Sequence, residues 1–146
     1  MQTMREITGT NEYPGGNDNP VILSWRDYIA QRYPEMTGYL RAYNHDSIPW
    51  CGLTVAYCMA KNNVRPVYGS DDLHRFLWAN AWASWGVKCE PKIGCVMVFT
   101  RNGGGHVALY EGEEGNHYII RGGNQSDSVN VMRMPKSQFT GARWPA

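Results

Sequence analysis

Apolar residues in the first half of the chain recur at helical spacing, whereas the second half carries short runs typical of strands. The first helix is predicted to begin where Asn19 can cap it and Pro20 can open it, and to end near Tyr33. Its apolar face consists of Ile22, Trp25 and Ile29. The polar segment 9–19 ahead of this helix is a turn-rich loop with almost nothing to bury.

A second helix is predicted from about Trp50 to Asn62, preceded by Pro49, which suits a helix entry because it lacks a backbone N–H. Residues three and four apart give this helix a wide apolar face, made of Leu53, Ala56, Tyr57, Met59 and Ala60. We therefore expect the helix to be buried, with Cys51 in its first turn.

A third helix is predicted between an N-cap at Ser70 and a stop at Gly86. Its apolar positions are Leu73, Phe76, Leu77, Trp78, Ala81 and Trp85. Short β-prone runs follow, separated by glycine-rich turns, at residues 96–99, 107–110, 118–120 and 129–132. Helices followed by an antiparallel sheet define the α+β class, and residues 1–146 have the length of a single domain.

Composition excludes several classes of function. The chain is 42% hydrophobic and 18% charged with a net charge of +1, which argues against nucleic acid as the main partner and against a polybasic membrane anchor. Residues 1–10 contain no apolar segment that would serve as a secretory signal or a membrane span. We therefore expect synthesis in the cytoplasm and no membrane insertion, with a separate export or release route if the protein acts outside the cell.

The four cysteines stand at positions 51, 58, 89 and 95, and their spacings do not match the short paired gaps of a zinc site. We expect no metal, no cofactor and reduced thiols. Cys89 and Cys95 flank a turn that contains Pro91 and Gly94, so the sequence leaves a disulfide between them open.

Cys51 is the candidate nucleophile. At a helix N-terminus, unpaired backbone N–H groups and the positive end of the helix dipole stabilise a thiolate. The alternative is a small buried apolar residue, which is the commoner role of a free cysteine. Residues further along the chain favour the first interpretation.

His106 is the candidate base. It follows three glycines and begins a predicted strand, with Val107 on the opposite face. The glycines allow another group to come close to it. A lone histidine at a strand start is often structural, but the other three lack a comparable setting: His45, His74 and His117.

Asn124 is the candidate for orienting the base. It lies in the segment 122–126, Gly-Gly-Asn-Gln-Ser, after the third predicted strand. Its side-chain oxygen can accept a hydrogen bond from the second imidazole nitrogen of His106 and so fix the tautomer of the ring. The alternative is a turn without a catalytic role, since Gly-Gly-Asn is also a good turn sequence.

The order of these residues resembles that of the papain-like CHAP and NlpC-type peptidoglycan hydrolases. In this chain the histidine follows the cysteine by 55 residues (106 − 51), and the polar residue follows the histidine by 18 (124 − 106). The resemblance is strongest to a small bacterial and phage group. The blocks that carry it span nearly the whole chain, at residues 12–20, 48–51, 82–86, 105–108, 122–126 and 141–145.

This resemblance implies a papain-like fold with N-terminal helices packed on an antiparallel sheet, and Cys51, His106 and Asn124 as nucleophile, base and orienting residue. It implies hydrolysis of an amide bond in the peptide part of bacterial peptidoglycan through an acyl-enzyme. The Cys51 N–H and a donor from the preceding loop, with Asn44 and Asp46 as candidates, would hold the oxyanion.

Substrate contacts are expected from the loop 12–19, above all from Asn17 and Asp18. The flat face of Trp50 and the room beside Gly105 complete the expected cleft. We expect a monomer whose own loops hold the substrate, because a chain of this length has no separate wall-targeting module.

One position departs from the group: Gly94-Cys95 stands where Gly-Asp is common before the first strand, and we expect this change to tune the fold. Two alternatives to a cell-wall lysin stay open. The same chemistry can serve an antibacterial toxin with an immunity or export partner, and the same fold can serve a binding module without catalysis. The sequence also leaves open whether the enzyme is an amidase or an endopeptidase.

Overall fold

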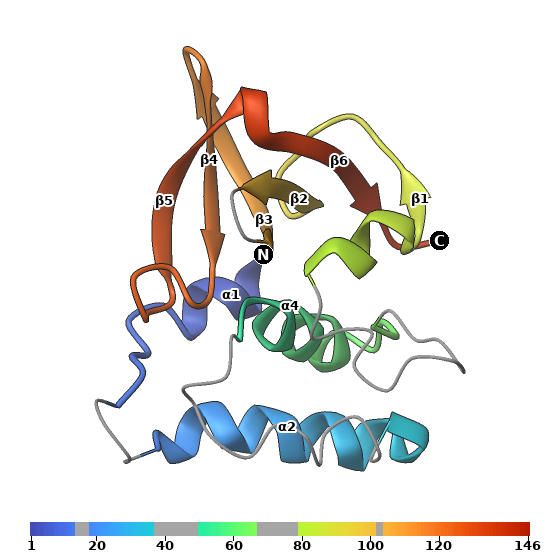
Figure 1. Ribbon diagram of the computed structural model, residues 1–146. Coiled ribbons are helices and arrows are strands. Elements are labelled where there is room, and N and C mark those ends of the chain that lie inside the picture. The colour runs from blue at the N-terminus through green and yellow to red at the C-terminus, as the bar shows by residue number, and fades with distance from the viewer. Residues whose placement is uncertain (14–17, 37–49, 67–78, 102–103) are drawn as a thin grey trace.

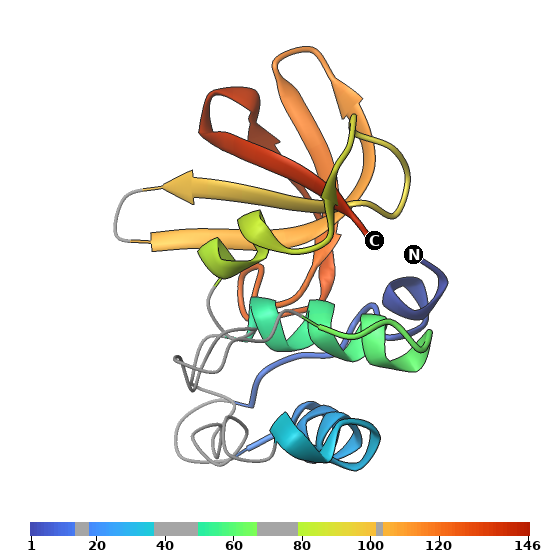
Figure 2. The ribbon, with the colours of Figure 1, turned by 90° about the vertical axis from the view of Figure 1, so that its right-hand side faces the viewer.

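The computed structural model describes residues 1–13, 18–36, 50–66, 79–101 and 104–146. The fold is α+β, as predicted, and combines helices with a six-stranded sheet. Figures 1 and 2 show three layers, with helix α4 (Cys51–Lys61) lying between the sheet and helix α2 (Pro20–Arg32). Three short 3-10 helices complete the described elements: η1 (Pro34–Met36), η3 (Ala79–Ser84) and η4 (Lys136–Gln138).

The sheet has the strand order β1-β6-β2-β3-β4-β5, and every neighbouring pair is antiparallel. Its strands are β1 (Val87–Lys88), β2 (Val96–Arg101), β3 (Gly104–Glu114), β4 (His117–Gly122), β5 (Asn130–Pro135) and β6 (Phe139–Trp144). The four predicted runs fall in β2, β3, β4 and β5, except that Val129 lies just ahead of β5, so the sequence located these four strands. It missed β1, which has only two residues, and β6, in which Ala142 alone is buried.

Helix α2 begins and ends as predicted. The Asn19 side chain accepts a hydrogen bond from the backbone N–H of Val21 (2.9 Å), and the helix ends before Tyr33. The amide of Asn19 also donates to the carbonyl of Asn11 (2.7 Å), which anchors the segment ahead of the helix. The three expected core residues are buried: Ile22, Trp25 and Ile29.

Helix α4 begins one residue after and ends one residue before the predicted bounds. Nine of its eleven residues are buried, because α2 packs on one side of it and the sheet on the other. A helix that is apolar nearly all round needs such neighbours to be stable. Its half-buried Tyr57 stacks on Trp25 of α2, with ring centroids 5.4 Å apart.

The sheet separates two groups of buried side chains. Val98 and Val107 belong to the group that contains the residues of α4, whereas Phe99 and Ala108 belong to a second group on the other face. Val107 and Ala108 thus lie on opposite faces of the sheet, as alternation along a strand requires. Each large apolar side chain buried in this way stabilises the fold by about 1.5–3 kcal/mol.

The predicted helix between Ser70 and Gly86 lies mostly outside the described residues. Its described part is the 3-10 helix η3, which packs on β2 and β3. Gly86 follows it with φ of +58°, and a Cβ atom at this position would collide with the carbonyl of Trp144. The stop at Gly86 therefore has a steric reason as well as a conformational one.

Ion pairs tie the N-terminal helix α1 (Gln2–Glu6) to the sheet. Arg121 donates to Glu111 (Nε to Oε2, 2.8 Å) and to the hydroxyl of Thr8 (2.8 Å), and Arg5 reaches the same carboxylate at 3.3 Å. The hydrogen bond from Arg121 lowers the pKa of the Glu111 carboxyl, and Arg5 lowers it further. No helix in the described part of the chain is long and apolar enough to cross a membrane.

Candidate active site

Cys51 is the first residue of α4 and is 6% exposed. The N-cap residue is Trp50, whose side chain makes no capping hydrogen bond to the helix. An indole N–H is a donor and cannot accept a hydrogen bond. The Trp50 side chain therefore leaves the backbone N–H groups of the first turn without a capping acceptor from the N-cap residue. Backbone N–H groups in this setting stabilise a thiolate or an oxyanion.

Trp50 does not line a cleft, and this prediction was wrong. Its side chain is fully buried, its ring lies 6.0 Å from that of Trp25, and its Nε1–H donates to Oε1 of Glu12 (3.1 Å). The side chain just ahead of α4 points into the space between α4 and α2, and a large ring fills that space. Trp50 therefore holds the start of α4 in place.

The segment 9–12 links the start of α4 to the end of the sheet. Backbone hydrogen bonds of 2.8 Å run from Gly9 N–H to the carbonyl of Val129, from Val129 N–H to Thr10, and from Glu12 N–H to Asp127. The side chain of Glu12 meanwhile accepts from Trp50. One short segment thus contacts both the residue before Cys51 and the residues that follow Gln125.

His106 lies in β3, opposite Phe99 of β2, and is 1% exposed. Its Nε2 lies 2.9 Å from Oε1 of Gln125, which is also buried. Gln125 belongs to the turn that follows β4. A side chain from this turn therefore fixes the orientation of the imidazole ring.

The amide of Gln125 is itself oriented by Asn130. Nε2 of Gln125 donates to the backbone carbonyl (2.8 Å) and to Oδ1 (2.9 Å) of Asn130, and Nδ2 of Asn130 donates to the carbonyl of Gln125 (2.8 Å). This network assigns the oxygen of the amide to the side of His106. Nε2 of His106 is then the protonated nitrogen, and Nδ1 is the basic nitrogen of the neutral ring.

The sequence predicted that Asn124 contacts the imidazole of His106. In the structure the next residue, Gln125, makes this contact through Nε2 of the ring. Asn124 has φ of +56°, in the left-handed region that asparagine tolerates better than most residues. Its conformation turns the chain so that Gln125 points back to the sheet. Asn124 therefore has the backbone conformation of a turn residue.

Two glycines let this turn approach its neighbours. A Cβ atom at Gly123 would collide with the hydroxyl of Thr54 and lie 2.9 Å from the ring of Trp50. A Cβ atom at Gly122 would lie 2.7 Å from that of Ala108 in β3. The turn thus lies against the first turn of α4 and against β3, so the segment that carries Gln125 contacts the helix that begins with Cys51.

The space beside Gly105 is occupied by Asn80 of η3, which corrects the expectation of open room there. A Cβ atom at Gly105 would lie 2.8 Å from Cγ of Asn80. Glycine at this position lets the exposed side chain of Asn80 lie against the backbone next to His106. Asn80 is a site neighbour that the sequence did not reveal, because it belongs to a segment whose pattern predicted a regular core helix.

The other predicted site residues are only partly described. Asn17, Asn44 and Asp46 lie outside the described residues, so their roles in substrate binding and in the oxyanion hole stay predictions. Asp18 is half-buried at the start of α2. In the described part of the chain, no three histidine, cysteine, aspartate or glutamate side chains lie close enough to hold a metal ion.

The other cysteines differ from Cys51 in position and environment, and none of the four forms a disulfide. Burial raises the pKa of Cys58 to about 12 and that of Cys95 to about 11. Cys89 adds a smaller upward effect on Cys95, so these two thiols are neighbours across the turn, without a disulfide. Cys95 packs beside Met97 at 3.5 Å, in the group of buried side chains on the face of the sheet away from α4.

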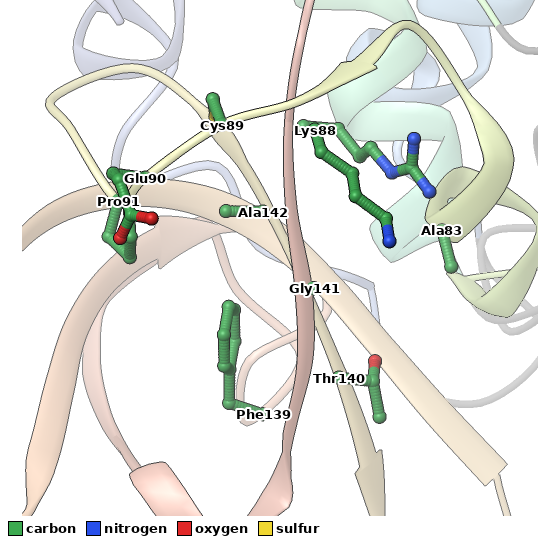
Figure 3. A pocket seen from close by; sticks show the side chains of 10 residues that line it. Ala83, Lys88, Cys89, Glu90, Pro91, Phe139, Thr140, Gly141 and Ala142 are labelled. Carbon is green, nitrogen blue, oxygen red and sulfur yellow. The ribbon is translucent and has the colours of Figure 1, made fainter.

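Two cavities lie elsewhere on the molecule. The larger, of about 600 Å³, borders β6 and the connection from β1 to β2 (Figure 3), and the smaller, of about 430 Å³, borders the segment 6–13 and the start of α2. Neither is lined by Cys51, His106 or Gln125. The candidate site is defined by the contact of Gln125 with His106 and by the contact of its turn with the start of α4, and not by the size of a cavity.

No family model matches the chain, and comparisons with curated proteins and with solved structures give no match. The resemblance in the sequence motifs therefore stays a hypothesis.

Proposed function

We propose that this protein is a cysteine amidohydrolase in which Cys51 is the nucleophile, His106 the base and Gln125 the residue that orients the base. One observation carries the proposal: a single turn contacts the first turn of α4 through Gly123 and binds the buried His106 through Gln125. A cysteine at a helix start, an imidazole and an oriented amide are the parts of a thiol hydrolase.

The proposed reaction begins with the transfer of the Cys51 thiol proton to Nδ1 of His106. The thiolate attacks the carbonyl carbon of the amide, and N–H groups at the start of α4 stabilise the oxyanion. His106 then returns the proton to the leaving amine, and a thioester links the acyl group to Cys51. Water, deprotonated by His106, attacks the thioester, which releases the acid and restores the thiol.

Gln125 supports both steps without changing its own charge. By accepting from Nε2–H of His106 it keeps Nδ1 as the nitrogen that exchanges protons with the thiol and the substrate. The neutral amide itself adds no fixed negative charge beside the ring. Asn130 acts through Gln125 and is a positioning residue.

We propose the peptide part of bacterial peptidoglycan as the substrate, within a papain-like fold of the NlpC or CHAP type. The support is the sequence resemblance together with the α+β layers and the order in which nucleophile, base and orienting residue follow one another.

Digestion of purified peptidoglycan, with mass spectrometry of the soluble products, tests the proposal. The wild-type protein is expected to release fragments that carry one new carboxyl and one new amine, whereas Cys51→Ala releases none. Cys58→Ala is the matched control, because it removes a buried thiol of the same helix and keeps the chemistry. Equal fragment release by Cys51→Ala and wild type would exclude Cys51 as the nucleophile.

A further inference from the structure

The larger cavity lies beside an open edge of the sheet. On one side, β6 pairs with β2 over residues 139–143, but on the other it pairs with β1 only at Arg143 and Trp144. A backbone hydrogen bond from Cys89 N–H to the carbonyl of Ala142 (3.2 Å) ends that second ladder. Among the described residues, 139–141 of β6 therefore have a neighbouring strand on one side only, and the cavity opens there (Figure 3).

Two cations stand together at the wall of this cavity. Lys88 and Arg143 are direct partners across β1 and β6, and both line the cavity. Like charges in opposite positions of a strand pair repel each other. In the described part of the chain, no ion pair joins either of them to a carboxylate. An anionic group between them would relieve this repulsion and gain charge-assisted hydrogen bonds.

The rest of the cavity wall defines which anions fit. Figure 3 shows the ammonium group of Lys88 and the carboxylate of Glu90 on opposite sides of the β6 strand. Phe139 and Pro91 supply apolar surface on the side of Glu90. The cavity thus favours a ligand that presents carboxylates on the Lys88 side of β6 and apolar groups on the side of Glu90.

We propose that this cavity receives an extended acidic peptide segment of a partner protein, which adds to the sheet beside residues 139–141 and places a carboxylate between Lys88 and Arg143. Strand addition supplies affinity through the main chain, and the pair of cations supplies selectivity. Three residues of open edge span roughly 10 Å at about 3.3 Å per residue. A volume of about 600 Å³ lies within the range of peptide-sized sites. The site shares no residue with the cysteine chemistry, so it goes beyond the proposed function.

Titration of the ¹⁵N-labelled full chain with a capped hexapeptide of alternating valine and glutamate tests the proposal. Backbone amide signals of residues 88–91 and 139–143 are expected to shift. The matched peptide of alternating valine and glutamine is expected to bind about tenfold more weakly, because it loses the charge-assisted hydrogen bonds. Equal affinities for the two peptides would overturn the role of the cations.

Variants on the protein side separate the cations from general charge. Lys88→Gln and Arg143→Gln should each weaken binding of the glutamate peptide about tenfold. Lys92→Gln is the matched control, because Lys92 lies over the ring of Trp144 at 3.8 Å and does not line the cavity. An equal loss in Lys92→Gln would show that only the net charge matters. Amide spectra of the free variants verify that each one folds.

N-methylated peptides test the strand addition itself and need no change in the protein. An added strand donates to β6 from every second amide, so methylation of one alternate set should abolish binding while methylation of the other set preserves it. Equal binding of both sets would exclude strand addition. If soluble peptidoglycan peptides shift the same signals and the capped hexapeptide does not, the cavity serves the cell wall and the assignment to a partner protein is wrong.

Discussion

A neutral amide, rather than a carboxylate, holds the imidazole of His106, and this affects both the charge and the tautomer of the ring. A carboxylate would favour the imidazolium form, whereas the oxygen of Gln125 fixes the tautomer without adding charge. Because Asn130 occupies both N–H groups of the amide, the Gln125 side chain cannot reverse without losing two hydrogen bonds. The imidazole of His106 is thus oriented by a network that extends into β5.

We expect Gln125→Ala to lower kcat by about 10- to 1,000-fold, because His106 loses the partner that fixes its tautomer and orientation. Asn124→Gly should keep activity within about twofold, since glycine accepts the left-handed conformation of this turn. Steady-state kinetics below the melting temperature of each variant measure both effects. A larger loss in Asn124→Gly than in Gln125→Ala would return the orienting role to Asn124.

Iodoacetamide should alkylate Cys51 faster than Cys58 and Cys95 in the folded protein between pH 6 and 9. Burial raises the pKa of the Cys58 thiol to about 12 and that of Cys95 to about 11, so both stay protonated across this range. Peptide mapping at several pH values gives the rate for each thiol. Unfolding in urea should bring the rates together. A rate at Cys51 no higher than at Cys58 would argue against an activated thiol at the start of α4.

At the scale of elements, the turn after β4 is the joint between helix and sheet. Neither of its glycines has room for a methyl group. A Cβ atom at Gly122 would collide with Ala108, and one at Gly123 would collide with Thr54 and Trp50. Shifts in this turn are transmitted to Gln125 and to the start of α4 at once. The site is therefore sensitive to packing as well as to the loss of catalytic side chains.

Gly123→Ala should destabilise the protein by about 1–3 kcal/mol, the usual cost of an additional carbon in a packed position. The added methyl group would meet the side chain of Thr54 and push the turn away from α4. Gly112→Ala in β3 is the matched control, since no atom lies within 4 Å of a Cβ built there. Urea unfolding of the three proteins measures the difference. Equal free energies of unfolding for the two variants would contradict the contact.

The elements that the sequence predicted well carry their signals locally. Helix α2 has its cap, its opening proline and its apolar face within its own residues, and all of them are observed. Strand β6 has none of these, because it owes its conformation to β2 and β1, which lie far from it in the sequence. Its Gly141 and its single buried residue, Ala142, obscure the alternation that identifies a strand.

The same distinction explains which site residues could be predicted. Cys51 has a local signal, the proline before a helix, and it is the first residue of α4 in the structure. His106 has another, the glycines before a strand, and it lies in β3. Asn124 and Gln125 are adjacent amides with similar chemistry. The choice between them depends on the φ angle of Asn124 and on Asn130, and neither is visible as a pattern. Trp50 was misplaced because only the packing of α2 shows that its ring is buried.

At the scale of the whole molecule, the ion pairs of Glu111 connect α1 to the sheet, and they make stability depend on pH. The folded-state pKa of Glu111 is lowered, so its contribution is present above the unfolded value of about 4.3 and is lost as the pH falls through the folded value. We expect Glu111→Gln to cost about 1–2 kcal/mol at pH 7 and less at pH 3. Urea unfolding at the two pH values measures the change.

Glu114→Gln is the control for this measurement. Glu114 pairs with Arg133 at 3.4 Å, and both side chains are more than half exposed. Water screens such a pair, so its loss should cost less than about 0.5 kcal/mol at either pH. A Glu111→Gln variant whose loss of stability is the same at pH 7 and pH 3 would mean that packing, and not the carboxylate charge, holds α1.

The segment 9–12 also has a consequence for the time course of folding. Glu12 pairs with Asp127, 115 residues further along the chain (127 − 12), and the same glutamate binds Trp50. Contacts between such distant residues form late, because closing a long loop costs entropy before any bond repays it. Helix α4 and the hairpin of β3 and β4 rest on local contacts and should form earlier. After dilution from urea, we expect far-ultraviolet circular dichroism to recover before the fast alkylation of Cys51 does.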